Sequence, residues 1–262
     1  MRITTWNARG LNAPSKKRIL KHNLKNFESD IILIQETKLN ISESSSLGRS
    51  IGNWSLITQE AAGASGGLGV IWNLRKVNLD ILSLNNNWVS CKCHSLKSNL
   101  SFIIINVYGP CINLEKRRVW NEISNFLFFN QNEMIIIGGD FNTILDPKEK
   151  IGGSSFLSNS SKDFKSWCEQ HNLIDIPTNN GIYTWNNRRK DFAYIAEKLD
   201  RFLVKGDLDF NNLNISASIL PITGSDHFPV RLDIEEPHKP VRNSFKCEKM
   251  WFLDQKLPFL LL

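Results

Sequence analysis

The chain has 262 residues, 41% of them hydrophobic and 22% charged, a composition that fits one large globular α/β domain or two small ones. Its five cysteines form no C-x-x-C pair, which argues against a thiolate zinc site, and no apolar run approaches the 18 residues of a membrane-spanning helix. The formal net charge of +6 favours a polyanionic partner.

Short runs rich in Ile, Val and aromatic residues, bounded by Gly, Asn and Ser, predict a series of strands. In chain order the predicted strands are Arg2–Trp6, Ile31–Gln35, Leu68–Trp72, Val77–Leu82, Trp88–His94, Ser101–Val107, Met134–Gly138, Tyr183–Trp185, Leu199–Val204, Ile215–Leu220 and Val230–Ile234. Apolar residues at helical spacing predict three helices, Ser15–Glu28, Leu114–Phe128 and Lys162–His171, the last with a capping box formed by Ser160 and Asp163.

Many strands with few helices predict an α/β fold of four layers, in which two mainly antiparallel sheets pack face to face with helices outside. Strand periodicity ends at Glu236, and Pro237 and Pro240 follow it, so we expect one domain over residues 1–236 and a linker or truncated segment over 237–262. The segment from His238 onward contains five Lys or Arg residues and two acidic residues, so it carries half of the net positive charge. The rest of the chain is only weakly basic, and any DNA affinity there would need local basic patches.

Polar residues stand at the carboxyl ends of four apolar runs. Asn7 follows the first strand, Glu36 follows the second, and Tyr108 and Asp140 follow the two Ile-rich runs in the middle of the chain. If these ends gather at one edge, they line a cleft with carboxylates, an amide and a phenol. Each residue alone has an ordinary interpretation as a surface group or a turn, whereas the joint order and placement point to a reaction site.

The loop before the last strand adds Ser225, Asp226 and His227, and Asn142 follows Asp140 after one residue. Hard oxygen ligands of this kind hold Mg²⁺ or Mn²⁺. Such a metal neutralises a scissile phosphate while a base activates water and donors hold the charged transition state. The set of residues therefore predicts phosphodiester cleavage.

Six motifs in this order resemble the endonuclease/exonuclease/phosphatase superfamily, whose members have a DNase I-like fold, and the resemblance covers residues 1 to about 236. The motifs are Trp6–Leu11 (WNARGL), Gln35–Thr37 (QET), Asn106–Pro110 (NVYGP), Gly139–Asn142 (GDFN), Leu199–Leu203 (LDRFL) and Ser225–His227 (SDH). The resemblance implies that Glu36 is the main ligand of Mg²⁺ or Mn²⁺, with Asn7 beside it, directly or through water.

The same resemblance implies the catalytic roles. Asp140 would activate or orient the attacking water, and Asn142 would hold the phosphate and the water. His227 would bind the phosphate, with Asp226 orienting its imidazole and Ser225 contributing to substrate binding. Tyr108 would contact the phosphate or the leaving group. The role of Asp200 would be to protonate the leaving group or to orient other groups.

Two segments resemble plant LINE-type (non-LTR) retrotransposons. Trp6–Asn12 looks like the opening of such a polyprotein, and Ser244–Trp251 is similar to the linker that precedes its reverse transcriptase. The resemblance implies an endonuclease that nicks DNA, with Thr184 near the phosphate. It also implies a hairpin that meets the minor groove, where Arg188, Arg189 and Lys190 would contact phosphates; a solvated loop tip is the alternative. The basic runs Lys16–Arg18 and Lys116–Arg118 are interpreted as solvated helix faces.

Several alternatives use the same residues. A phosphatase or phosphodiesterase acting on a small phosphorylated substrate and an abasic-site DNA repair endonuclease share this motif set. A catalytically dead DNA-binding remnant and a structural module are further readings. The sequence predicts DNA as partner, no membrane association and no small-molecule cofactor, in an intracellular, nuclear protein. The DNA target sequence, the number of metals and the oligomeric state are left open.

Overall fold

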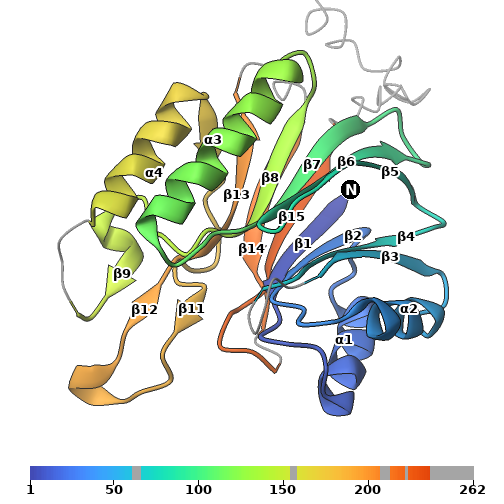
Figure 1. The fold of residues 1–262 in the computed structure, drawn as a ribbon, viewed down its shortest axis with the longest axis horizontal. Helices are drawn as coiled ribbons and strands as arrows, with labels where there is room; N and C mark the ends of the chain where they lie inside the picture. The colour runs from blue at the N-terminus through green and yellow to red at the C-terminus, as the bar shows by residue number, and fades with distance from the viewer. Residues whose placement is uncertain (61–65, 154–157, 207–212, 222–223, 237–262) are drawn as a thin grey trace, which may run out of the picture.

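The computed structural model describes residues 1–60, 66–153, 158–206, 213–221 and 224–236. The predicted segment 237–262, with the linker-like stretch Ser244–Trp251, lies outside these described residues. Two six-stranded sheets pack face to face, with helices on their outer sides (Figure 1). The predicted four-layer α/β sandwich is therefore confirmed.

The first sheet has the strand order β14-β15-β1-β2-β4-β3. Its strands are β1 (Arg2–Asn7), β2 (Ile31–Gln35), β3 (Trp54–Gln59), β4 (Leu68–Asn73), β14 (Asn214–Ile219) and β15 (Val230–Glu235). Only β1 and β2 run parallel in it, and the other neighbours are antiparallel.

The second sheet has the order β10-β13-β8-β7-β6-β5. Its strands are β5 (Val77–Leu84), β6 (Trp88–Ser95), β7 (Ser101–Tyr108), β8 (Ile135–Asp140), β10 (Leu173–Asp175) and β13 (Asp200–Lys205). It too contains a single parallel pair, β7 with β8.

The helices cover the two outer faces. Helices α1 (Pro14–Asn26) and α2 (Ile41–Arg49) pack on the first sheet, and α3 (Asn113–Phe129) and α4 (Asn159–Gln170) pack on the second (Figure 1). On α3 the buried side chains recur every three or four residues, so that one stripe of the helix meets the sheet. Short 3₁₀ turns form at η1 (Pro147–Glu149) and η2 (Asp191–Ala193).

The central strands are buried on both faces, which explains their unbroken apolar sequences. On β7, Phe102 and Ile104 face the other sheet, while Ile103, Ile105 and Val107 face the helices. The inward row continues beyond Ile104 with a polar residue, Asn106, and the same happens on β1 with Asn7 and on β8 with Asp140. One end of the space between the sheets is thus apolar and the other polar.

Several predictions of local structure need correction. The described residues contain four α-helices rather than three, because the Ser-rich segment of α2 also folds as a helix, with a capping box formed by Asn40 and Glu43. Helix α4 begins earlier than predicted: Ser158 is its N-cap, and its side chain accepts a hydrogen bond from Ser161 N, whereas Ser160 and Asp163 form no capping box.

A third, small sheet stands apart from the sandwich. It joins β9 (Lys150–Ile151), β11 (Trp185–Asn186) and β12 (Ala196–Glu197) in the order β11-β12-β9. The predicted strand Tyr183–Trp185 is thus shorter and begins at Trp185. Strands β11 and β12 form the base of a hairpin that extends away from the body of the molecule (Figure 1).

Candidate active site

The carboxyl ends of four strands meet at one edge of the sandwich. Because β1 and β2 are parallel, Asn7 lies beside Gln35, and Glu36 follows directly. Because β7 and β8 are parallel, Tyr108 lies beside Asp140, which on its other side pairs with Asp200 at the start of β13. The structure therefore brings together the strand-end residues that the sequence pattern singled out.

Asn7 joins the two sheets at this edge. Its Nδ2 donates to Glu36 Oε1 at 3.0 Å and to Asp140 Oδ2 at 2.8 Å. All three side chains are buried or nearly so. An amide that donates to two carboxylates holds them at a set separation and offsets part of their repulsion.

His227 reaches the same cluster from the loop before β15. Its Nδ1 lies 2.9 Å from Asp200 Oδ2, and its Nε2 lies 3.9 Å from Asp140 Oδ2. Burial lowers the pKa of His227, but the charges of Asp200 and Asp140 outweigh burial and raise it to about 9. The imidazole is therefore held as a cation near neutral pH.

The Asp140 carboxyl has the opposite shift. Burial raises the pKa of Asp140 to about 6, and Asp200 adds to this rise, while His227 and the hydrogen bond from Asn7 oppose it. A carboxylate with a pKa near 6 is a stronger base than an ordinary Asp and is still ionised at neutral pH.

The predicted role of Asp226 needs correction. The carboxylate that contacts the His227 imidazole belongs to Asp200, whereas Asp226 accepts hydrogen bonds from Arg9 Nε at 3.0 Å and from Trp185 Nε1 at 2.9 Å. Asp226 therefore ties the loop after β1 and the hairpin to the loop of His227. The sequence did not predict this, because Asp226 is adjacent to His227 in the chain, whereas Asp200 comes near the imidazole only in the folded structure.

Asn142 lies in a sharp turn after β8. Its backbone is left-handed, with φ of 50°. Its backbone N donates to Asp140 Oδ1 at 2.9 Å, and its Nδ2 donates to Gly109 O at 2.8 Å. A Cβ on Gly109 would stand 2.3 Å from Phe141 O, so the close approach of the two strand ends requires glycine there.

Tyr108 and Thr184 complete the set. Burial raises the pKa of Tyr108, as do Glu36 and Asp140, so the phenol stays protonated and can donate. Thr184 is fully buried, and its hydroxyl accepts from the backbone N of Leu199 and of Asp200. Thr184 thus fixes the start of β13, and its contact with substrate stays a prediction. Buried Ser225 donates to Asn7 O at 2.7 Å.

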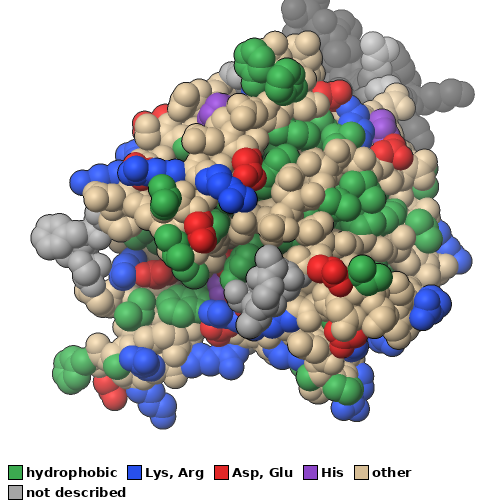
Figure 2. Space-filling view, viewed as in Figure 1, with side chains coloured by type: hydrophobic (Ala, Val, Ile, Leu, Met, Phe, Trp, Pro, Cys, Tyr) green, Lys and Arg blue, Asp and Glu red, His purple; other side chains and the backbone are tan. Residues whose placement is uncertain are grey.

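The hairpin carries its cations at the side of the site. Arg188 donates to Ser225 O, and Arg189 and Lys190 are exposed. Phe192 stands fully exposed in η2, at the far end of the hairpin. Figure 2 shows Lys and Arg side chains along the lower edge of this face, over the hairpin and below α1.

Several residues at the site were not identified from the sequence. The side chain of Arg9 bridges Glu36 and Asp226, and Lys16 donates to Ala8 O and Gly224 O. Lys116 is 4% exposed and donates to Asn142 O, so it is not the solvated residue that was predicted, whereas Lys16 is half-buried. Lys116 shares the spacing of the apolar stripe of α3, a signal that could have shown its burial.

The donor chemistry fits a hard divalent cation. Oxygens of Glu36 and Asp140 converge at one edge, and one ligand atom from each of Asp140, Asp200 and His227 lies within 4.8 Å of the others. Asp200 Oδ1 is buried and has no hydrogen-bond partner. Buried carboxylates with a free oxygen are suited to Mg²⁺ or Mn²⁺ rather than to a soft metal.

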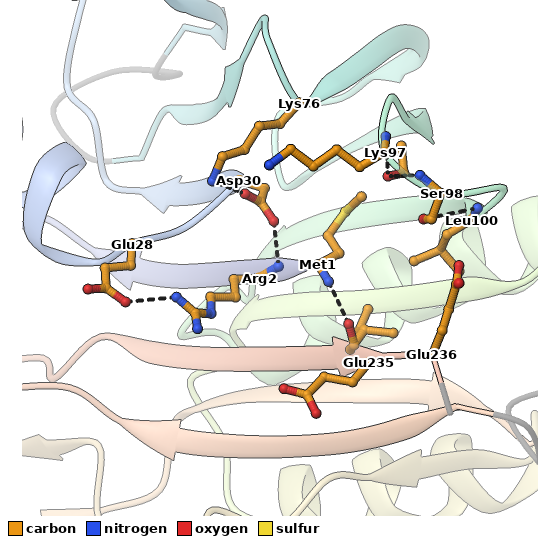
Figure 3. Close-up of a pocket in the computed structure, with 12 residues that line it drawn as sticks. Met1, Arg2, Glu28, Asp30, Lys76, Lys97, Ser98, Leu100, Glu235 and Glu236 are labelled. Atoms are coloured by element: carbon orange, nitrogen blue, oxygen red, sulfur yellow. Dashed lines mark hydrogen bonds and ion pairs between the residues drawn. The ribbon is translucent and has the colours of Figure 1, made fainter. Parts of the chain in front are cut away.

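A larger hollow in the described residues lies elsewhere, at the opposite ends of the strands. It has a volume of about 490 Å³, and its lining includes Met1, Arg2, Glu28, Asp30 and Lys76 (Figure 3). Charges there already pair, Arg2 with Glu28 at 2.7 Å and Lys76 with Asp30 at 2.6 Å. This hollow therefore offers no comparable convergence of reactive groups.

The chain is similar in sequence and in fold to known nucleases. The chain is 24% identical over 269 residues to an exodeoxyribonuclease of Bacillus subtilis (strain 168), a match that covers 89% of this chain and 99% of that protein. Among solved structures, the AP endonuclease LMAP of Leishmania major is similar with a TM-score of 0.72 and 16% identity, over 90% of this chain and 87% of that one. The endonuclease domain of TRAS1, a telomere-specific non-LTR retrotransposon, has a TM-score of 0.68 and 12% identity, over 90% and 98%.

These low identities to solved structures support the fold alone. The decisive finding is a family model, described as the Endonuclease/Exonuclease/phosphatase family, which matches residues 4–227. In the described residues no helix is both long and apolar enough to cross a membrane. The match spans every strand-end residue of the site, and the chain belongs to the Endonuclease/Exonuclease/phosphatase family of hydrolases.

Proposed function

We propose that this chain is a divalent-metal-dependent endonuclease that nicks DNA, as the cleaving domain of a LINE-type retrotransposon acting on nuclear DNA. The observation that carries the proposal is the convergence of Glu36, Asp140, Asp200 and His227, linked through Asn7, beside a projecting basic hairpin. The first feature suits phosphodiester hydrolysis, and the second suits a polymeric substrate.

In this proposal Glu36 would hold Mg²⁺ or Mn²⁺, with Asn7 beside it, and the bound cation would supply positive charge that offsets the charge of the reacting phosphate. Asp140 accepts a proton from the water whose oxygen attacks phosphorus, and Asn142 orients that water. The His227 imidazolium donates to a phosphate oxygen, and Asp200 keeps it charged and in place. As the bond from phosphorus to the leaving oxygen breaks, the Tyr108 phenol donates a hydrogen bond to that oxygen, which takes its proton from water.

The charges around the site favour DNA over a small phosphate ester. Arg9, Lys16 and Arg188 line a hollow beside Asp226, and Arg189 and Lys190 are exposed on the hairpin. Cations spread beyond the reacting groups suit a substrate that carries many phosphates, such as a DNA duplex.

A panel of substrates tests the proposal. The purified chain with Mg²⁺ is offered supercoiled plasmid, a duplex oligonucleotide with one abasic site, and a small phosphate monoester. We expect nicking of intact plasmid, at a rate at least equal to incision per abasic site. Preference for the abasic duplex would indicate a repair endonuclease, and turnover of the monoester alone would replace the proposal with a phosphatase.

A further inference from the structure

Lys116 is a buried cation that the mechanism above does not use. It lies in the first turn of α3, and 4% of its surface is exposed. Its ammonium donates a hydrogen bond to Asn142 O. No ion pair joins it to a carboxylate of the described residues, whereas Lys198, a comparably buried lysine, contacts Asp175 and Glu149.

This placement opposes folding in two ways. Removing an ammonium from water is costly without a counter-charge, and burial accordingly lowers the pKa of Lys116 while Cys111 and Asp140 raise it. The positive end of the helix dipole also lies at the first turn of α3, where a cation is unfavourable. A methionine has a similar volume and would carry neither cost.

The group that Lys116 holds belongs to the candidate site. Asn142 has a left-handed backbone, a conformation that few residues other than Gly, Asn and Asp adopt, and its N and Nδ2 donate to Asp140 Oδ1 and Gly109 O. The bond from Lys116 secures the remaining polar backbone group, the carbonyl. The turn is thus held from β8, from the end of β7 and from α3.

We propose that Lys116 is a positioning residue for catalysis: its ammonium fixes the Asn142 turn, so that the Asn142 side chain and the Asp140 carboxylate act on the same attacking water. The proposal rests on the assigned function, in which these two residues act on a phosphodiester. Proteins commonly keep a locally destabilising residue where that residue orders a reaction site. Displacement of a reacting group by about 1 Å lowers the reaction rate by up to about 100-fold.

The test compares Lys116→Met with Arg117→Met in plasmid nicking and thermal unfolding. Arg117 is the adjacent exposed cation, paired with Asp163 on α4, and it has no place in the proposed site. We expect Lys116→Met to keep or raise the Tm while kcat falls about 10- to 100-fold and KM stays within about 3-fold. Arg117→Met should leave kcat unchanged.

A double-mutant cycle adds a readout that a purely structural role would not move. In an Asn142→Ala background, Lys116→Met should lower kcat no further, because the group it positions is already gone. An unchanged kcat in the single variant, a marked loss of Tm, a rise in KM without a fall in kcat, or full additivity with Asn142→Ala would each overturn the proposal. Absence of nicking by the wild type would instead overturn the assigned function.

Discussion

The contact between Asp200 and His227 sets the protonation state of the site. At 2.9 Å the carboxylate stabilises the imidazolium, and Asp140 adds a second negative charge. The pKa of His227 therefore rises to about 9 although burial opposes it, and burial raises the pKa of Asp140 to about 6. The proposed mechanism needs ionised Asp140 and protonated His227, so activity should be greatest between these two values.

Asp200→Asn should move the alkaline limb of this profile most, because Asp200 is the largest cause of the raised pKa of His227 and only a secondary cause of the raised pKa of Asp140. Removing the nearest negative charge lowers the pKa of His227, so the alkaline fall in kcat/KM should shift to lower pH, with a loss of about 10- to 100-fold at pH 8. Steady-state nicking between pH 5.5 and 9.5 measures this, with Asp163→Asn on α4 as a control of equal charge. An alkaline limb that stays in place would contradict the assignment of Asp200 as the partner of His227.

The sequence predicted which residues at the strand ends form the site, but it did not predict which side chains they contact. Asn7, Glu36, Tyr108 and Asp140 each end an apolar run, and parallel pairing brings such ends together. Which carboxylate meets His227 depends on the packing of β13 against β8, and no sequence pattern encodes that choice between neighbours. The same holds for Lys116, whose charge concealed its place on the buried stripe of α3.

At the scale of elements, periodicity predicted the central strands and three helices, and it failed where burial is partial. Every residue of the edge strand β3 is half-buried, so its sequence shows neither alternation nor an apolar run. Helix α2 buries only Ser44 and Leu47, and its capping box was the better signal. Such elements form because β4 and the first sheet offer them a surface.

The hairpin element carries a prediction about DNA affinity. Arg189→Ala/Lys190→Ala removes two exposed cations, so DNA affinity should fall, and the slope of log K against log salt should decrease by up to about 2. Filter binding or anisotropy across salt concentrations measures both. Lys162→Ala/Lys165→Ala on the exposed face of α4 removes the same charge elsewhere. Equal losses in the two variants would mean that the hairpin has no special role.

At the scale of the whole molecule, a buried charge network joins segments on either side of β13. Arg201 is 1% exposed; its guanidinium contacts Glu149 through both terminal nitrogens at 2.8 and 3.0 Å, and Asp175 at 3.1 Å. It also donates to Thr143 O and Lys198 O. The loop after β8, which follows Asn142, is thus anchored to the strand that begins with Asp200.

Loss of this cation should destabilise the fold. Arg201→Ala leaves the Glu149 and Asp175 carboxylates buried with less compensation, so the free energy of unfolding should fall by about 3–5 kcal/mol. Urea denaturation measures this. Arg118→Ala breaks an exposed pair with Glu122 and should cost at most about 0.5 kcal/mol. A loss below about 1 kcal/mol for Arg201→Ala would show that the network contributes little to stability.

The most direct test of the account is metal-dependent nicking by the site at the strand ends. Wild-type chain with Mg²⁺ and supercoiled plasmid should yield open circles, whereas EDTA, Glu36→Gln and His227→Gln should each abolish the conversion while circular dichroism shows that both variants are folded. Arg117→Met serves as the active control. A folded wild type that leaves plasmid intact with Mg²⁺ and with Mn²⁺, or a Glu36→Gln variant that nicks at the wild-type rate, would contradict the central claim.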